Sequence, residues 1–123
     1  MTIGSAMRAS ASGMAAERFR MDVISVNIAN ANTTRVGNQA PYRSRDVVLE
    51  ATNEGVKIAE VRQSQNPFPV RNIPGVGNVE TSDVEPITEM VNMLSASRAY
   101  EANIAAFNTA KGMVKNALNI GRV

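Results

Sequence analysis

The sequence predicts a mainly α-helical chain, in which long N- and C-terminal helices pair as a coiled coil and a small β-hairpin and loop insert lies between them. Residues 87–119 contain no proline, and apolar side chains recur in them every seven residues. That repeat consists of Met93, Tyr100, Phe107 and Val114. Residues 3–31 carry a similar repeat, and such repeats form seams against other helices. We therefore expect residues 1–34 and 83–123 to form a helical domain and residues 35–82 to form the insert.

The first predicted helix has the weaker seam. Its seven-residue repeat consists of Met7, Met14, Met21 and Ile28. Ile3 and Ile24 lie on the adjoining line of the helix, but Ser10 and Glu17 interrupt that line. Gly13 costs the helix about 1 kcal/mol relative to alanine. Such a helix is marginal alone, so we expect its stability to come mostly from partner helices.

A β-hairpin is predicted within residues 46–63. Two short apolar runs flank residues 52–55, Thr-Asn-Glu-Gly, which form a turn signal of hairpin length. Val56 and Ile58 share one face of the second strand, whereas Val61 points to the other face unless a bulge intervenes. An isolated hairpin is barely stable in water, so this one must pack on the helices or on a neighbouring subunit.

Proline and glycine indicate irregular structure on both sides of the hairpin. We expect residues 36–44 to be extended and residues 66–82 to form a loop. The second helix should begin after Asp83 or Glu85, either of which supplies a capping carboxylate, with Pro86 in its first turn.

The composition argues against enzyme chemistry. The chain has no histidine and no cysteine, so nucleophilic triads and thiolate metal sites are excluded. Residues 75–77, Gly-Val-Gly, lack the third glycine and the lysine of a phosphate-binding loop. Glu85 and Glu89 lie near a helix N-terminus, where carboxylates are simply favourable. We expect no catalytic residues, no cofactor and no metal.

Nucleic-acid binding and membrane insertion are also not expected. The net charge is +2, and Arg35, Arg43 and Arg45 do not share one helical face. The longest uncharged run, residues 23–34, is polar and well short of the roughly 20 apolar residues of a membrane span. Arg8 interrupts the first apolar run, so no secretory signal peptide is indicated.

Three asparagines follow one another at the end of the first predicted helix. Helix termination explains Asn30 and Asn32, but it explains Asn27 less well. Each side-chain amide offers donors and an acceptor. A row of amides beside an apolar seam is suited to specific contacts between helices, so we expect these asparagines to take part in an interface.

Two motifs at opposite ends of the chain resemble a known family. Residues 21–35, MDVISVNIANANTTR, closely resemble the N-terminal signature of bacterial flagellar axial proteins. Residues 87–91, 97–103 and 108–111 provide the second half of the match. Together they are similar to the flagellar basal-body rod proteins of C type, and residues 41–43, Pro-Tyr-Arg, also fit that type. A sibling axial protein is the alternative within the family. A soluble basic helical regulatory module is the alternative outside it.

The resemblance implies a structural subunit of the proximal rod of the flagellum. Such subunits are exported through the flagellar type III apparatus without a cleaved signal peptide, and they assemble helically in the periplasm. Their terminal helices surround the export channel, and the rod transmits torque from the membrane ring toward the hook. The implied partners are other copies of the chain, other proximal rod proteins, the distal rod protein and the ring-to-rod junction.

The seams, the asparagines and the matched motifs define one candidate interface. Its residues are Met7, Met14, Met21, Ile24, Asn27, Ile28, Asn30, Asn32, Thr33, Tyr42, Arg43, Met93, Tyr100, Asn103, Ile104, Phe107, Val114 and Leu118. The resemblance weakens at residues 72–82, where C-type proteins usually have a longer loop. That difference affects the contacts expected of the loop and not the family.

Overall fold

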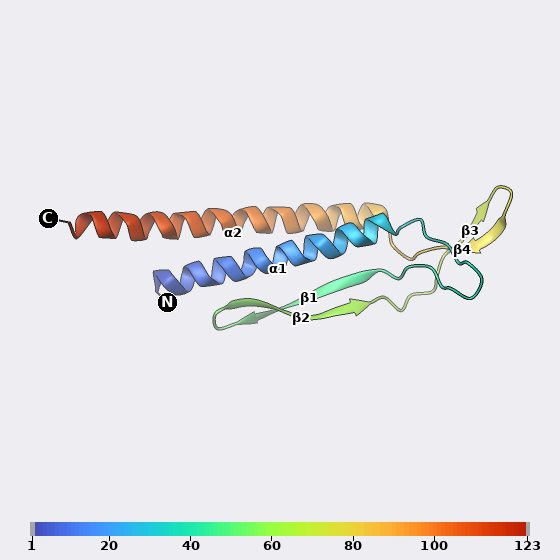
Figure 1. The fold of residues 1–123 in the computed structure, drawn as a ribbon, viewed down its shortest axis with the longest axis horizontal. Coiled ribbons are helices and arrows are strands. Elements are labelled where there is room, and N and C mark those ends of the chain that lie inside the picture. Colours follow the sequence, from blue (N-terminus) through green and yellow to red (C-terminus); the bar gives the residue numbers. More distant parts are fainter. Residues whose placement is uncertain (1, 123) are drawn as a thin grey trace.

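Two long helices lie side by side and form most of the molecule (Figure 1). The computed structural model describes residues 2–122. Helix α1 spans Ile3–Ala29 and helix α2 spans Pro86–Ile120, and the two run antiparallel. Both predicted helices are confirmed, and their observed ends differ from the predicted ones by two residues or fewer.

Two small antiparallel hairpins make up the insert. Strands β1 (Arg45–Thr52) and β2 (Gly55–Gln63) form one, and strands β3 (Val70–Ile73) and β4 (Gly77–Glu80) form the other. The first hairpin follows α1 on the side away from α2, so α1 lies between α2 and the hairpin (Figure 1). The second hairpin lies beyond the ends of the helices. The mainly α fold with a β insert is therefore confirmed.

Polar side chains define both ends of α1. Thr2 and Ser5 form a capping box, in which each side-chain oxygen accepts a hydrogen bond from the other residue's backbone N–H. At the other end, the Nδ2 of Asn30 donates to the backbone oxygen of Val26 at 2.8 Å. The asparagine thereby satisfies a carbonyl of the last turn, and the helix ends at Ala29.

The start of α2 differs from the prediction in one respect. Glu85 occupies the N-cap position and Pro86 follows it, but no side chain caps the free N–H groups. The carboxylate of Asp83 instead accepts a hydrogen bond from the backbone N–H of Ser44 at 2.7 Å. Glu85 accepts one from the hydroxyl of Thr88. The predicted carboxylate cap is therefore wrong, because both carboxylates have other donors within reach.

The β1–β2 hairpin contains the bulge on which its apolar face depends. Leu49 pairs with Ile58 and Val48 pairs with Glu60, so the residue between these partners on β2 has no partner of its own. The shift brings Val61 opposite Val47. Directly paired residues point to the same side of a sheet, so Val61 shares a face with Ile58.

The β3–β4 hairpin lies within residues that we predicted to be a loop, and that prediction is wrong for residues 70–80. Each strand has only four residues, and prolines precede the first strand and follow it directly. Such short strands provide too little alternation to indicate a strand. Gly75 and Gly77, with φ of 84° and 98°, supply the backbone conformations that the turn needs.

The core is thin and consists largely of small side chains. Its buried apolar residues are Ala16, Ile24, Ala31, Val47, Val84, Ala96 and Ala110. Where the helices meet, a Cβ added at Gly13 would lie 2.7 Å from the side-chain nitrogen of Asn103. The glycine thus permits a close helix approach that a larger residue would prevent, which explains its place inside α1.

Candidate assembly interface

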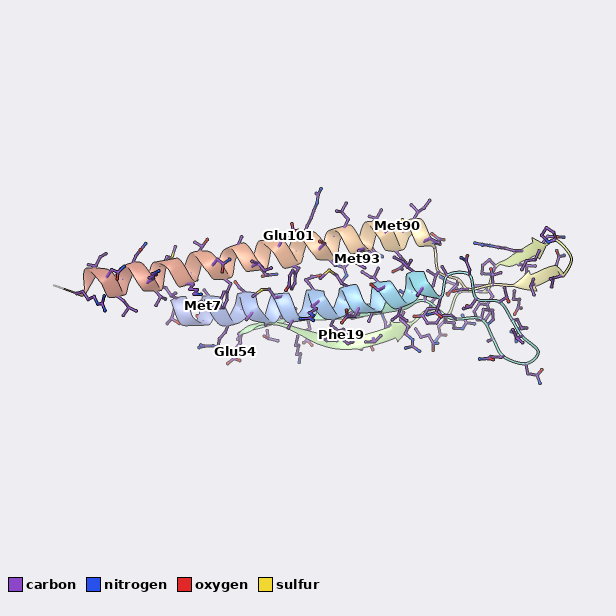
Figure 2. The ribbon with its side chains drawn as sticks, turned by 45° about the horizontal axis from the view of Figure 1, so that its top comes forward. Met7, Phe19, Glu54, Met90, Met93 and Glu101 are labelled. Atoms are coloured by element: carbon purple, nitrogen blue, oxygen red, sulfur yellow. The ribbon has the colours of Figure 1, made fainter. Side chains whose placement is uncertain are left out.

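The residues of the two predicted seams are only partly covered within the subunit. Met14, Met93, Tyr100 and Phe107 are half-buried, and Ile24 is fully buried. Met93 lies on the side of α2 that faces α1, whereas Met90 and Glu101 project from the opposite side (Figure 2). Met7, Met21, Ile28 and Ile104 are also half-buried. The chain alone therefore leaves part of each seam accessible.

Two predicted interface residues lie where α1 does not reach. Val114 is 36% exposed and Leu118 is 69% exposed. Both are in the last turns of α2, which extends beyond the first residue of α1 (Figure 1). In the register set by the contact between Gly13 and Asn103, Val114 lies just past the first residue of α1 and Leu118 lies further beyond it.

Asn27 is the buried centre of a polar cluster, which we call the Asn27 node and which contains Asn27, Tyr42, Arg45 and Glu89. The Nδ2 of Asn27 donates to the backbone oxygen of Arg45 at 2.7 Å and to Oε2 of Glu89 at 3.2 Å. Its Oδ1 accepts from the Tyr42 hydroxyl at 2.7 Å and from the Arg45 backbone N–H at 3.1 Å. All four hydrogen-bonding positions of the amide are thereby used.

The Asn27 node connects α1, the extended segment, β1 and α2 at one point. Asn27 is 0% exposed and Glu89 is 8% exposed. A buried amide with every bond satisfied is stable, whereas the loss of any partner leaves a buried polar group unpaired. Asn27 therefore acts inside the subunit in this structure. A direct contact between its side chain and a neighbouring subunit would require the node to open.

The environment of Tyr42 reflects this burial. Desolvation raises the pKa of its phenol above the ordinary value, and the positive charge of Arg45 opposes that rise. The negative charges of Glu89 and Asp83 raise the pKa further. The phenol is therefore held in the neutral form, which can donate its proton to Asn27.

Other predicted residues surround the node in different roles. The hydroxyl of Thr33 accepts from the Tyr42 backbone N–H at 2.9 Å and donates to the Asn30 backbone oxygen at 3.0 Å. Arg43 donates to the backbone oxygen of Asn66 and stacks over the ring of Phe68 at 4.0 Å. These contacts fix the extended segment and its neighbouring loop. They lie within the subunit, as do those of Asn27.

The remaining predicted asparagines are not part of the node. The Asn103 side chain lies against Gly13 in the helix contact and donates to the backbone oxygen of Ala99 at 2.9 Å. Asn32 is exposed. The four predicted asparagines thus have different roles: Asn27 is buried in the node, Asn30 bonds to the last turn of α1, Asn103 packs between the helices and Asn32 is exposed.

A second attachment of the insert was not predicted. Near the hairpin turn, the backbone N–H of Val56 donates to the hydroxyl of Ser12 at 3.0 Å, and that hydroxyl donates to the Ala9 backbone oxygen. Gly55 has φ of 139°, and a Cβ there would overlap the Ser12 hydroxyl. The hairpin is thus fixed to α1 at both of its ends. In the sequence, only the glycine of the turn indicated this site.

Comparisons with known proteins agree with this architecture. The family model for the flagella basal body rod protein matches residues 7–35, and the model for the C-terminal part of the flagellar basal body rod FlgEFG proteins matches residues 76–120. These two segments contain most of α1 and all of α2. The match defines the class: a structural protein of the flagellar basal-body rod.

Curated relatives define the particular family. The chain is 35% identical to the flagellar basal-body rod protein FlgC of Bacillus subtilis, and the alignment covers 99% of the chain and 100% of the relative. It is 37% identical to FlgC of Salmonella typhimurium, with coverage of 90% and 92%. The chain therefore belongs to the FlgC family of flagellar basal-body rod proteins. The predicted resemblance to rod proteins of C type is confirmed.

The described part of the chain shows neither a membrane span nor a metal cluster. Among residues 2–122, no helix has the length and apolar character that crossing a bilayer requires. Within the same residues, no group of three or more acidic side chains is placed to hold a metal ion.

Proposed function

We propose that this rod subunit belongs to the proximal rod, where it assembles helically around the export channel and transmits torque toward the distal rod and hook. The observation that carries the proposal is the partial exposure of the α1–α2 seams. Tyr100 and Phe107 are half-buried within the chain, so apolar surface remains for other helices. A subunit that packs against several neighbours needs such surface.

The pairing of α1 and α2 as a coiled coil belongs to the same proposal. Its support is the seven-residue spacing of both seams, together with their position at the helix contact. We assign residues 1–34 and 83–123 to the inner helical domain and residues 35–82 to the outward segment. The side of α2 away from α1 carries no part of the insert (Figure 1), so it is free to face the axis of the rod.

Torque transmission requires a rigid connection between the inner helices and the outward segment. The Asn27 node and the Ser12–Val56 hydrogen bond supply two such connections on α1, one at each end of the β1–β2 hairpin. Two separate attachments resist rotation of the hairpin about α1, which one attachment would permit. A load on the insert is thereby passed to the helix pair.

The partners that we propose are other copies of the chain, other proximal rod proteins, the distal rod protein and the ring-to-rod junction. Of the predicted interface residues, Asn32, Val114 and Leu118 are exposed and therefore available to neighbours without rearrangement. We further propose that the subunit reaches the periplasm through the flagellar type III export apparatus without loss of a signal peptide.

Fractionation of flagellated cells tests the proposal. We expect the chain in detergent-purified basal bodies, with the same N-terminal residues as the unprocessed polypeptide. A strain that lacks the chain should form no distal rod or hook, and the wild-type chain should restore both. Recovery of the chain only outside basal bodies, or normal hooks in its absence, would contradict the proposal. A shortened N-terminus would contradict the export route alone.

A further inference from the structure

Helix α1 begins at Ile3 and does not extend alongside the last two turns of α2 (Figure 1). The contacts Gly13–Asn103 and Asn27–Glu89 set an antiparallel register that places Ile3 beside Met113. The C-terminal end of α2 accordingly projects past the first turn of α1 (Figure 1). We call residues 113–120 the free end of α2.

One face of the free end continues the surface that α1 covers elsewhere. Val114 follows Phe107 by seven residues, and Leu118 follows Val114 by four, so both lie on the α1-facing line of α2. Leu118 is 69% exposed. The free end thus offers the same kind of apolar surface as the helix contact, at the point where α1 stops.

Cations border this apolar line. Lys111, Lys115 and Arg122 recur at helical spacing beside Val114 and Leu118, and all three are exposed. None of them forms an ion pair within residues 2–122. The sequence contains no aspartate or glutamate after Glu101, so the positive charge of this region is not offset locally.

We propose that the free end receives an acidic amphipathic helix from a different rod subunit, lying end to end with α1. This inference rests on the proposed function. The apolar side chains of the incoming helix would continue the α1–α2 contact, and its carboxylates would pair with Lys111 and Lys115. A second copy of α1 fits poorly, because its first charged residue is Arg8 and its first acidic residue is Glu17. The start of α2 from a second copy also offers little, because the acidic residue in its first turn, Glu89, is buried in the Asn27 node and does not reach a neighbour.

The proposed contact at the free end of α2 is small, so it must be measured in the assembled rod and not between free subunits. Two apolar side chains and a few ion pairs bury far less than the roughly 1,000 Å² of a stable interface. Such a contact is weak between free subunits and becomes effective only where the assembly holds both partners in place. The experiment therefore uses assembled basal bodies.

The first measurement is a site-specific crosslink. A photoreactive benzoyl-phenylalanine replaces Leu118 in the full chain, basal bodies are isolated and irradiated, and the crosslinked peptide is sequenced. We expect a peptide of another rod protein with apolar residues three or four apart and a carboxylate within one helical turn. Ala105 is the control position, because it is exposed and lies one turn from Glu101 on the side away from α1. A probe there should not capture that peptide.

The second measurement reverses the charge. The double variant Lys111→Glu with Lys115→Glu should lower the yield of the Leu118 crosslink about tenfold, because attraction becomes repulsion. Arg98→Glu is the matched control, since Arg98 is an exposed cation three residues before Glu101 on the outer side of α2. Its crosslink yield should stay within about twofold of the wild type.

Several results would overturn the inference. They are a crosslink to another copy of this chain, a crosslink to a segment without carboxylates, the absence of any crosslink at Leu118, and a yield that charge reversal leaves unchanged. Each differs from failure of the proposed function, which would be seen as absence of the wild-type chain from basal bodies.

Discussion

The two ends of the α1–α2 pair are built in opposite ways. At one end, Asn27 at the centre of the node is polar, buried and fully hydrogen-bonded. At the other end, Val114 and Leu118 are apolar and exposed. Polar groups are normally found at the surface and apolar groups inside, so each end departs from the usual distribution. The two ends therefore have different roles. The node fixes the shape of the subunit, and the free end of α2 is available to a neighbour.

The largest expected effect is loss of the node's central amide. Asn27→Leu keeps a similar volume but leaves the Tyr42 hydroxyl, the Arg45 N–H and the Glu89 carboxylate without that partner. Each buried unpaired group costs about 1–3 kcal/mol, so we expect the free energy of unfolding to fall by about 4 kcal/mol. Denaturant unfolding of the purified subunit, followed by circular dichroism, measures this. Asn32→Leu at an exposed position is the control, and equal losses for both variants would remove the distinction between node and surface.

A smaller effect is expected in the seam between the two ends. Phe107→Asp or Tyr100→Asp places a charge at a half-buried position, from which the carboxylate can still reach water. We therefore expect a loss of about 2 kcal/mol in subunit stability, less than full burial of a charge would cost. Rod assembly and swimming should be lost, because the seam is also proposed to meet neighbours. Ala102→Asp, at an exposed position of the same helix, is the control; normal motility of the seam variants would contradict the seam assignment.

The phenol of Tyr42 should make the stability of the subunit depend on pH, which can be tested by comparing the wild type with Tyr42→Phe. Its pKa is raised in the folded chain, so the folded state binds the proton more tightly than the unfolded state does. The resulting stabilisation is complete below the unfolded pKa of about 10 and is lost as the pH rises through the higher folded pKa. We expect Tyr42→Phe to lower stability by about 1 kcal/mol at neutral pH and to weaken its decline above pH 10. Thermal unfolding at a series of pH values tests this, and an unchanged decline would exclude Tyr42 as its source.

The smallest effect on stability is expected at the free end. Leu118→Ser changes a side chain that is 69% exposed, so the free energy of unfolding should change by less than about 0.5 kcal/mol. The number of assembled rods should nevertheless fall, because the apolar contact with the neighbour is lost. Counting hooks by electron microscopy measures assembly. If Leu118→Ser destabilised the isolated subunit, or if it assembled normally, the claim that the free end serves assembly whereas Asn27 serves stability would be wrong.

Prediction from sequence succeeded where the signal is local and repeated. Helix positions follow from the seven-residue repeats, and Asn30 indicates the end of the first helix. The β1–β2 hairpin follows from its turn, and the structure contains the bulge that could bring Val61 to the face of Ile58. The β3–β4 hairpin was missed because its strands are too short for alternation to be visible. The motif at residues 21–35 and the motifs of the C-terminal helix together indicated the family, which the comparisons confirm.

The sequence by itself determined two seamed helices, a β insert between them and the rod-protein family. Only the tertiary structure decided what the individual polar residues do. Asn27 and Asn32 are indistinguishable as residue types, yet one is buried with four hydrogen bonds and the other is exposed. Glu89 looked like a favourable charge near a helix start, but it is a partner of Asn27 across 62 positions of the chain. Such roles depend on which segments meet in space, and hydrogen bonds between segments far apart in sequence leave no periodic signal in it.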